Sequence, residues 1–68
     1  MNKPIKGSEV EAGDIVLIYG GTQQVTVNRV KRNEIFKSIE LQDLSGSWSG
    51  ISPDENVTLI GHFNPEPE

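Results

Sequence analysis

Cysteine is absent from this 68-residue chain, and histidine, tryptophan and tyrosine each occur only once. The lack of cysteine excludes disulfide bonds and thiolate metal sites. The one histidine, His62, cannot form a zinc site without further ligands of the right type. A chain this short buries only about 60% of the surface that its unfolded form exposes, so its stability is expected to be marginal. We therefore expect one small apolar core and neither a metal nor a cofactor.

Long apolar runs are also missing. No stretch approaches the roughly 20 residues of a membrane span, and the first seven residues lack the apolar segment of a secretory signal. From these absences we expect a cytoplasmic protein without a membrane partner. The net charge of −4 argues against a general nucleic-acid binder, because such proteins usually carry an excess of basic residues.

What the chain does contain is two-residue alternation of apolar side chains, which is typical of strands. Strands are predicted near residues 15–19, 23–32, 36–42, 48–51 and 57–60, and all five are expected to contribute to one interior. Turn residues separate them at Gly20-Gly21, Asn33-Glu34, 45–47 and 52–56.

Two of these strands carry irregularities. Val25 and Val27 share one face of the second strand while Val30 lies on the other, so a bulge is expected near Asn28-Arg29. In the third strand Ile35, Ile39 and Leu41 share one parity and are expected to point inward. Residues 29–42 also partly fit a helical stripe, but the lack of a cap and the β-branched content make a helix the weaker alternative.

The end of the chain resembles that of an SH3-like barrel. Residues 48–53, Trp-Ser-Gly-Ile-Ser-Pro, are followed by the apolar residues 57–60, and in that family a tryptophan strand leads through a proline-containing 3₁₀ turn into a final strand. Asn56 stands where the peptide-binding members carry a tyrosine, and Tyr19 is the only aromatic residue near the first predicted strand. The resemblance therefore implies the barrel shape and not the proline-rich peptide site.

A second resemblance is to the strand core of self-cleaving SOS repressors and signal peptidases. It is carried by residues 13–18 (Gly-Asp-Ile-Val-Leu-Ile), 27–30 (Val-Asn-Arg-Val), 39–41 (Ile-Glu-Leu) and 59–61 (Leu-Ile-Gly). That family uses a serine nucleophile activated by a neutral lysine. The lysine would fall at Asn28, and an amide cannot accept the serine's proton. This resemblance implies a relative without catalytic residues.

Together these patterns predict an all-β fold, a small SH3-like barrel of about five antiparallel strands over residues 9–63. Residues 1–8 are expected to form a flexible lead-in. Residues 64–68, Asn-Pro-Glu-Pro-Glu, are expected to form a disordered acidic tail.

The candidate partner-binding residues are the aromatic side chains Tyr19, Phe36 and Trp48. Small residues flank Trp48, which can leave its indole exposed as a binding anchor. The same indole can instead fill one end of a barrel, and the scarcity of aromatic residues favours that interior position.

The basic residues Arg29, Lys31, Arg32 and Lys37 form the one local charge asymmetry. They can contact nucleic-acid phosphates, with an aromatic side chain for base stacking. They can equally be the solvent side of a hairpin, where lysine discourages edge pairing, and this second interpretation is favoured.

No arrangement of acids, serines or His62 has the spacing of a calcium loop, a catalytic triad or a phosphate loop. The chain is therefore not expected to be an enzyme. The leading hypothesis is a small accessory or regulatory protein that docks on a larger protein partner. The alternatives are nucleic-acid binding through the face around Arg29–Lys37, and a catalytically empty relative of the repressor-type peptidase core.

Overall fold

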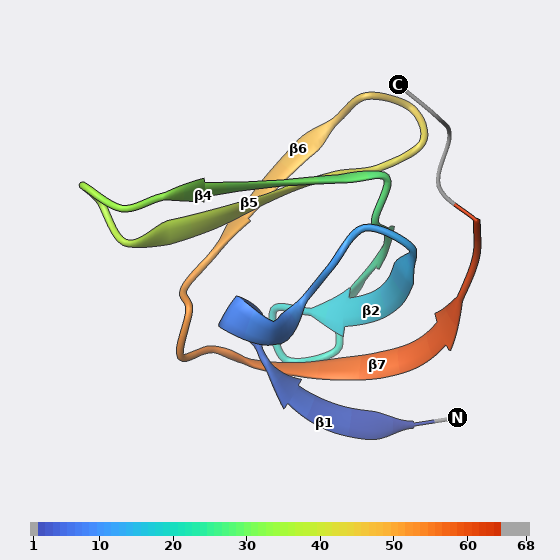
Figure 1. Ribbon diagram of the computed structural model, residues 1–68. Helices are drawn as coiled ribbons and strands as arrows, with labels where there is room; N and C mark the ends of the chain where they lie inside the picture. Colours follow the sequence, from blue (N-terminus) through green and yellow to red (C-terminus); the bar gives the residue numbers. More distant parts are fainter. Residues whose placement is uncertain (1, 65–68) are drawn as a thin grey trace.

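The computed structural model describes residues 2–64, which form an all-β domain (Figure 1). The elements are, in chain order, β1 (Lys3–Lys6), the 3₁₀ turn η1 (Gly7–Glu9), β2 (Asp14–Ile18), β3 (Gln23–Thr26), β4 (Arg29–Asn33), β5 (Ser38–Gln42), β6 (Trp48–Ile51) and β7 (Asn56–His62). The all-β prediction is confirmed, and the helical alternative over residues 29–42 is wrong, because β4 and β5 occupy that segment. No helix within residues 2–64 is long and apolar enough to cross a membrane.

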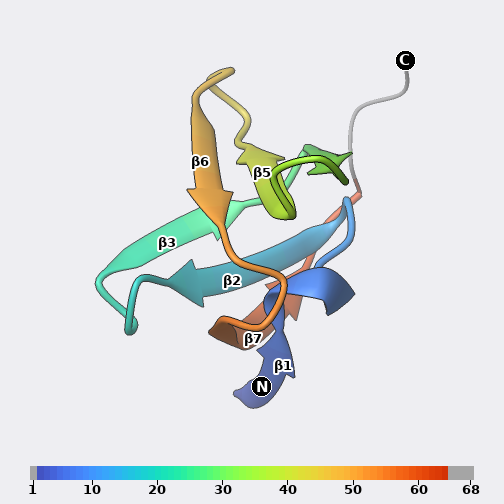
Figure 2. The same ribbon diagram turned by 90° about the vertical axis from the view of Figure 1, so that its left-hand side faces the viewer.

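The strands form two antiparallel sheets rather than one closed barrel of five strands. Sheet A has the order β1-β7-β2-β3, and sheet B has the order β4-β5-β6 (Figure 2). The core lies between them and consists of ten buried aliphatic residues: Val10, Val16, Ile18, Val25, Val27, Ile39, Leu41, Ile51, Val57 and Leu59. Both sheets supply these side chains, so the domain has one interior, as the alternation predicted.

The chain passes from sheet A to sheet B between two consecutive residues. The Val27 N–H donates to the Asp14 carbonyl at 2.8 Å, whereas the Asn28 N–H donates to the Gln42 carbonyl of sheet B at 2.7 Å. The predicted single strand 23–32 is therefore two strands, and a change of sheet stands where a bulge was expected. This change resets the side-chain parity between Val27 and Val30. A register irregularity does occur, but between Ile15 and Val16 in the β2–β7 pairing.

The start of the chain differs from the lead-in that the sequence predicted. Residues 3–6 form β1, which pairs with β7 in the register Lys3↔Leu59 to Lys6↔Asn56. The segment that follows is held by the 52–55 connection, because the Gly7 N–H donates to the Glu55 carbonyl at 2.8 Å. The predicted tail, residues 64–68, lies outside the described residues except for Asn64.

Ile35 is not part of the interior, contrary to the prediction. The β4–β5 turn spans residues 34–37 instead of Asn33-Glu34, and β5 begins only at Ser38. Ile39 and Leu41 are buried as expected, but Ile35 is 86% exposed. The turn is longer than predicted, so Ile35 leaves the strand alternation that would have directed it inward.

Candidate functional site

A functional site in the described residues has to lie on the surface. The buried side chains of residues 2–64 are all apolar, and no side-chain nitrogen or oxygen atom in this range is buried without a hydrogen-bond partner. Nor do these residues contain a group of three or more histidine or acidic side chains that could hold a metal ion. Exposed apolar side chains and unpaired charges are therefore the features to consider.

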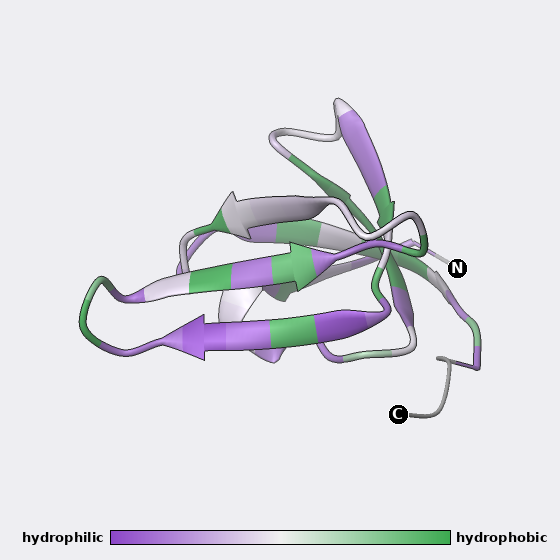
Figure 3. Ribbon diagram, turned by 90° about the horizontal axis from the view of Figure 1, so that it is seen from above, coloured by the Kyte–Doolittle hydropathy of each residue, from purple (hydrophilic) through white to green (hydrophobic). Residues whose placement is uncertain are grey.

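The most unusual surface feature is the tip of the β4–β5 hairpin, which projects beyond the rest of the domain (Figure 1). The tip residues Ile35 and Phe36 are 86% and 78% exposed. Figure 3 shows this hydrophobic tip at the end of the long hairpin. Turns are normally built from polar residues and glycine. Two adjacent large apolar side chains in an exposed turn are therefore unusual and indicate a candidate interaction site.

The turn that carries this pair is ordered by its own hydrogen bonds. The Asn33 Oδ1 atom accepts the N–H groups of Ile35 at 3.0 Å and Phe36 at 3.1 Å. Lys37 completes the turn in the left-handed region, with a φ of 53°. Asn33 pairs with Ser38 at the end of the β4–β5 ladder, so the turn continues directly from the strands. The apolar pair is thus displayed in a defined geometry.

A cleft of about 300 Å³ lies beside the tip. It is lined by Arg32, Asn33, Glu34, Lys37, Ser38, Ile39 and Pro53. Its charged side chains are two cations and one carboxylate. One of the cations, Arg32, is oriented by the Val10 carbonyl, which accepts from Nη2 at 3.1 Å, and by the Ser8 carbonyl at 3.4 Å.

The outer face of sheet B carries a second grouping. Arg29, Gln42 and Trp48 occupy one cross-strand row, and Lys31 lies in the outward row two residues further on. Leu41 is buried, so its neighbour Gln42 and both of Gln42's partners project to the opposite face. An open depression is lined by residues of both faces of β4 and by the segment before β2: Glu11, Ala12, Asn28, Arg29, Val30, Arg32 and Trp48.

The four predicted basic residues do not share one surface. Arg29 and Lys31 belong to the outer face of sheet B, and Lys37 lies in the hairpin turn. Arg32 has the inward parity of Ile39, and its guanidinium reaches the η1 segment. Arg29 and Arg32 both line the open depression, and Arg32 and Lys37 both line the cleft beside the tip, but neither hollow is lined by all four residues.

The three predicted aromatic residues are also dispersed. Phe36 lies at the hairpin tip, whereas Trp48 lies at the opposite end of sheet B, opposite Gln42. Trp48 is 49% exposed, so its indole does not fill the interior. Tyr19 follows β2, and its hydroxyl donates to the Gly50 carbonyl at 2.7 Å, which joins the β2–β3 turn to sheet B. Tyr19 therefore has a structural role in addition to its exposed face.

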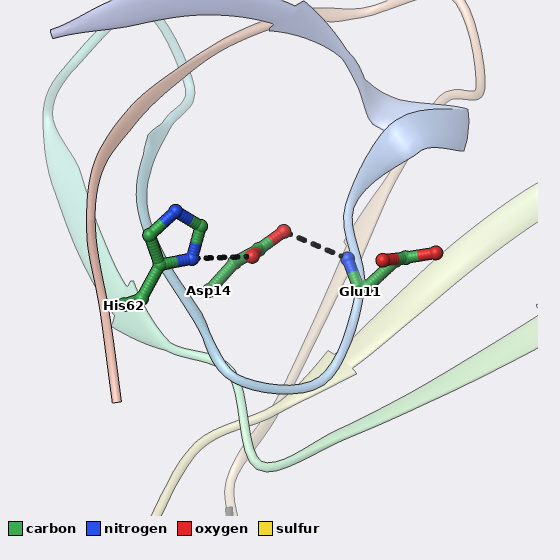
Figure 4. Close-up of polar contacts among 3 residues, drawn as sticks. All are labelled: Glu11, Asp14 and His62. Carbon is green, nitrogen blue, oxygen red and sulfur yellow. Dashed lines mark hydrogen bonds and ion pairs between the residues drawn. The ribbon is translucent and has the colours of Figure 1, made fainter. Parts of the chain in front are cut away.

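The one histidine forms a pair with an acidic residue (Figure 4). The His62 Nδ1 atom lies 3.3 Å from Asp14 Oδ1, and the other carboxylate oxygen of Asp14 accepts the Glu11 N–H at 3.0 Å. The Asp14 side chain is 13% exposed and the His62 side chain 57%. These contacts connect the end of β7 to the turn before β2, where the Phe63 N–H also donates to the Gly13 carbonyl at 2.8 Å. The His62–Asp14 pair therefore has a structural role, because it joins the end of β7 to the start of β2.

Asp43 organises the β5–β6 turn. Its Oδ1 atom accepts the Ser45 hydroxyl at 2.6 Å and the N–H groups of Ser45 and Ser47 at 2.9 and 3.1 Å. These donors stabilise the charged form, the Ser45 hydroxyl most of all, and they hold the pKa of Asp43 below its ordinary value. This turn also carries Leu44, which is 57% exposed.

Sequence reasoning found Phe36 but missed Ile35 as an exposed residue. A signal was present, because two adjacent apolar residues in a strand must point to opposite faces. The pair Ile35-Phe36 next to the turn residues Asn33-Glu34 could therefore have indicated an exposed apolar tip. The orientation of Arg32 had no such signal, because its carbonyl partners lie 22 and 24 residues away.

Comparison with known proteins gives no relative. No protein-family model, no curated protein and no solved structure matches the chain.

Proposed function

We propose that this protein is a non-catalytic docking module that binds a protein partner through the tip of the β4–β5 hairpin. The observation that carries the proposal is the exposure of Ile35 and Phe36, 86% and 78%, on a turn fixed by Asn33. Exposed apolar clusters on small soluble domains commonly mark interaction sites.

Burying a side chain such as Ile or Phe is worth about 1.5–3 kcal/mol. Because the turn is already ordered by the Asn33 bonds, a partner does not have to fix its conformation, and more of this energy remains as affinity. The core of the domain does not use these two side chains, so the energy is available only to a partner.

We further propose that the two sheets are an opened SH3-like barrel. In support, Trp48 begins β6, Pro53 follows in the connecting segment, and β7 is the last strand of the domain. The strands and the proline follow the order of the sequence resemblance, but the connection over residues 52–55 is a turn and not the expected 3₁₀ turn. The hairpin tip is distant from the end of sheet B that carries Trp48, so the proposed docking surface does not depend on an aromatic peptide groove.

The test uses four variants, first in an extract of the source cell and then with the purified complex. The double substitution Ile35→Ser/Phe36→Ser should abolish recovery of the partner, and each single substitution should weaken the purified complex at least about tenfold by calorimetry. Leu44→Ser is the matched control, because Leu44 is 57% exposed on a different turn. Retention of the partner by the double variant, or an equal loss with Leu44→Ser, would contradict the proposal.

A second candidate is binding of single-stranded nucleic acid on the outer face of sheet B. The observation that favours it is the row that places Arg29 beside Gln42 and the half-exposed Trp48, with Lys31 on the same face. Bases stack on exposed aromatic rings, and cations track the phosphates.

Trp48 is the one tryptophan of the chain and therefore reports directly on this face. Titration with oligothymidylate should quench its fluorescence, and the affinity should fall as salt is raised. Lys31→Ala should weaken binding, whereas Lys3→Ala on β1 should not. Unchanged fluorescence at low salt would remove this candidate.

The third interpretation, a catalytically empty relative of the repressor-type peptidase core, is also a non-catalytic protein. Asn28 occupies the position where that resemblance would require a lysine. Cleavage of a peptide bond by the purified chain would contradict both this interpretation and the docking module.

A further inference from the structure

We infer that the partner of the hairpin tip presents a carboxylate next to its apolar contact, and that the cleft between Arg32 and Lys37 receives this carboxylate. The inference rests on the proposed docking function and names the chemistry of the partner. Its starting point is continuity: the cleft is lined by Glu34 and Lys37, which directly flank Ile35 and Phe36 in the turn. A partner that covers the tip therefore also covers the mouth of the cleft.

The cleft offers donors suited to a carboxylate. The Arg32 guanidinium is already oriented by two carbonyl groups, which use only its Nη2 end, and a guanidinium has five N–H donors in all. Lys37 forms no ion pair or side-chain hydrogen bond with another residue in the range 2–64. One oriented cation and one available ammonium group therefore face an incoming anion.

The remaining lining residues limit what can enter. Glu34 contributes one negative charge, and Ile39 and Pro53 form apolar walls. A volume of about 300 Å³ is at the lower end of the range for small-ligand pockets. These features suit a single acidic side chain on an apolar stem, and they do not suit the repeated phosphates of a nucleic-acid strand.

The charge distribution of the whole chain agrees with an acidic partner. Residues 29–42 contain four cations and two carboxylates, a net charge of +2, whereas the other residues of the range 2–64 contain two lysines and six carboxylates, a net charge of −4. An acidic surface is repelled by the rest of the domain and attracted by the hairpin. An acidic partner is therefore expected to meet the hairpin first, where the tip and the cleft lie next to each other.

The test uses a display library of random twelve-residue peptides, selected on the intact protein and counter-selected on the Ile35→Ser/Phe36→Ser variant. The expected peptides carry Asp or Glu within about three residues of a large apolar side chain. A synthetic peptide from this set should bind at least about fivefold more weakly to Lys37→Gln. Lys31→Gln is the matched control, because it removes the same charge from the outer face of sheet B. Changing the peptide's acidic residue to its amide should abolish the Lys37→Gln effect.

The outcomes separate the two proposals. Peptides that require Ile35 and Phe36 but contain no acidic residue, or that are insensitive to Lys37→Gln, would overturn this inference and leave the docking function intact. An oligonucleotide that displaces the peptides and depends on Lys37 would assign the cleft to phosphate and would also overturn it. A selection that yields no tip-dependent peptide would overturn the docking function and, with it, the inference.

Discussion

The β2–β3 turn and the β4–β5 turn share one backbone feature but differ in how they are connected to the rest of the domain. Each contains one non-glycine residue in the left-handed region, Tyr19 with a φ of 54° and Lys37 with a φ of 53°. Tyr19 ties its turn to the other sheet through the Gly50 carbonyl, and its N–H reaches a Glu55 carboxylate oxygen at 3.4 Å. The turn of Lys37 is held only by Asn33, which lies within the same hairpin.

This difference shows what the apolar and aromatic side chains of the two turns do. In the β2–β3 turn the phenol completes a hydrogen bond between the sheets and contributes to the fold. In the β4–β5 turn Ile35 and Phe36 contact almost nothing, although the turn is equally well defined. The side chain of one turn is therefore bonded to the other sheet, whereas the apolar side chains of the other turn stay exposed.

The largest expected effect concerns the anchored base of the projecting hairpin. Leu41 of β5 is fully buried, and Leu41→Ala should lower the free energy of unfolding by about 2–5 kcal/mol. A domain of this size has a total of about 3–10 kcal/mol at roughly 0.05–0.15 kcal/mol per residue, so the variant should be largely destabilised. Urea denaturation measures the change. Phe36→Ser on the same hairpin should change stability by no more than about 0.5 kcal/mol, and a larger loss would mean that the tip is not free.

A smaller effect is expected at Gly7, which holds the η1 segment against the connection before β7. A Cβ atom at Gly7 would lie 2.2 Å from the Ser52 carbonyl oxygen and 3.1 Å from Ile51 Cδ1. Gly7→Ala should therefore cost about 1–3 kcal/mol, because backbone has to move. At Gly50 a Cβ meets nothing within 4 Å. Thermal denaturation of Gly7→Ala and Gly50→Ala would contradict this account if the two variants were equally stable.

The hydrogen bond that joins the β2–β3 turn to β6 should contribute less to the free energy of unfolding. Tyr19→Phe removes the 2.7 Å hydrogen bond to Gly50 and should cost about 0.5–1.5 kcal/mol. Faster amide hydrogen exchange should be confined to the turn and to the facing part of β6. If exchange at residues 19–22 stays at the wild-type rate, this hydrogen bond does not hold the turn, and the contrast with the β4–β5 turn is lost.

The smallest effect belongs to the third hairpin turn, around Asp43. The pKa of Asp43 is lowered in the folded state, chiefly by the Ser45 hydroxyl. Its contribution to stability is therefore complete above the ordinary aspartate value of about 3.9 and is lost as the pH falls through the lower folded-state value. NMR titration from about pH 6 to about pH 2 should show the Ser45 and Ser47 amide signals shifting together. Asp43→Asn should remove that titration, and if it persists another group is responsible.

Several features of this fold could be predicted because they depend on local pattern. The short apolar run Ile15–Ile18 and the alternation over Ile39–Leu41 indicated strands, and Gly20-Gly21 indicated the first hairpin. The parity change between Val27 and Val30 was also visible in the sequence. It could not distinguish a bulge from a change of sheet, because both shift the side-chain phase by one residue.

Other features depend on contacts between distant residues. Residues 3–6 contain one large apolar side chain, Ile5, and become a strand because β7 provides hydrogen-bonding partners 50 to 56 residues later. The candidate site likewise has one part that local pattern could predict and another that depends on distant contacts. The exposed Phe36 was among the predicted partner-binding residues, whereas the cleft beside it requires Arg32 to turn toward Val10 and Pro53 to approach from another connection.

The order of strands in sheet A has a consequence for how the protein is made. β7 lies between β1 and β2 in the sheet, yet it is the last of the three to leave the ribosome. Until residues 56–62 are available, β1 has no neighbour and β2 lacks one of its two. Sheet A can therefore be completed only when nearly all of these residues have been synthesised, and the nascent chain reaches its native form in a late, cooperative step.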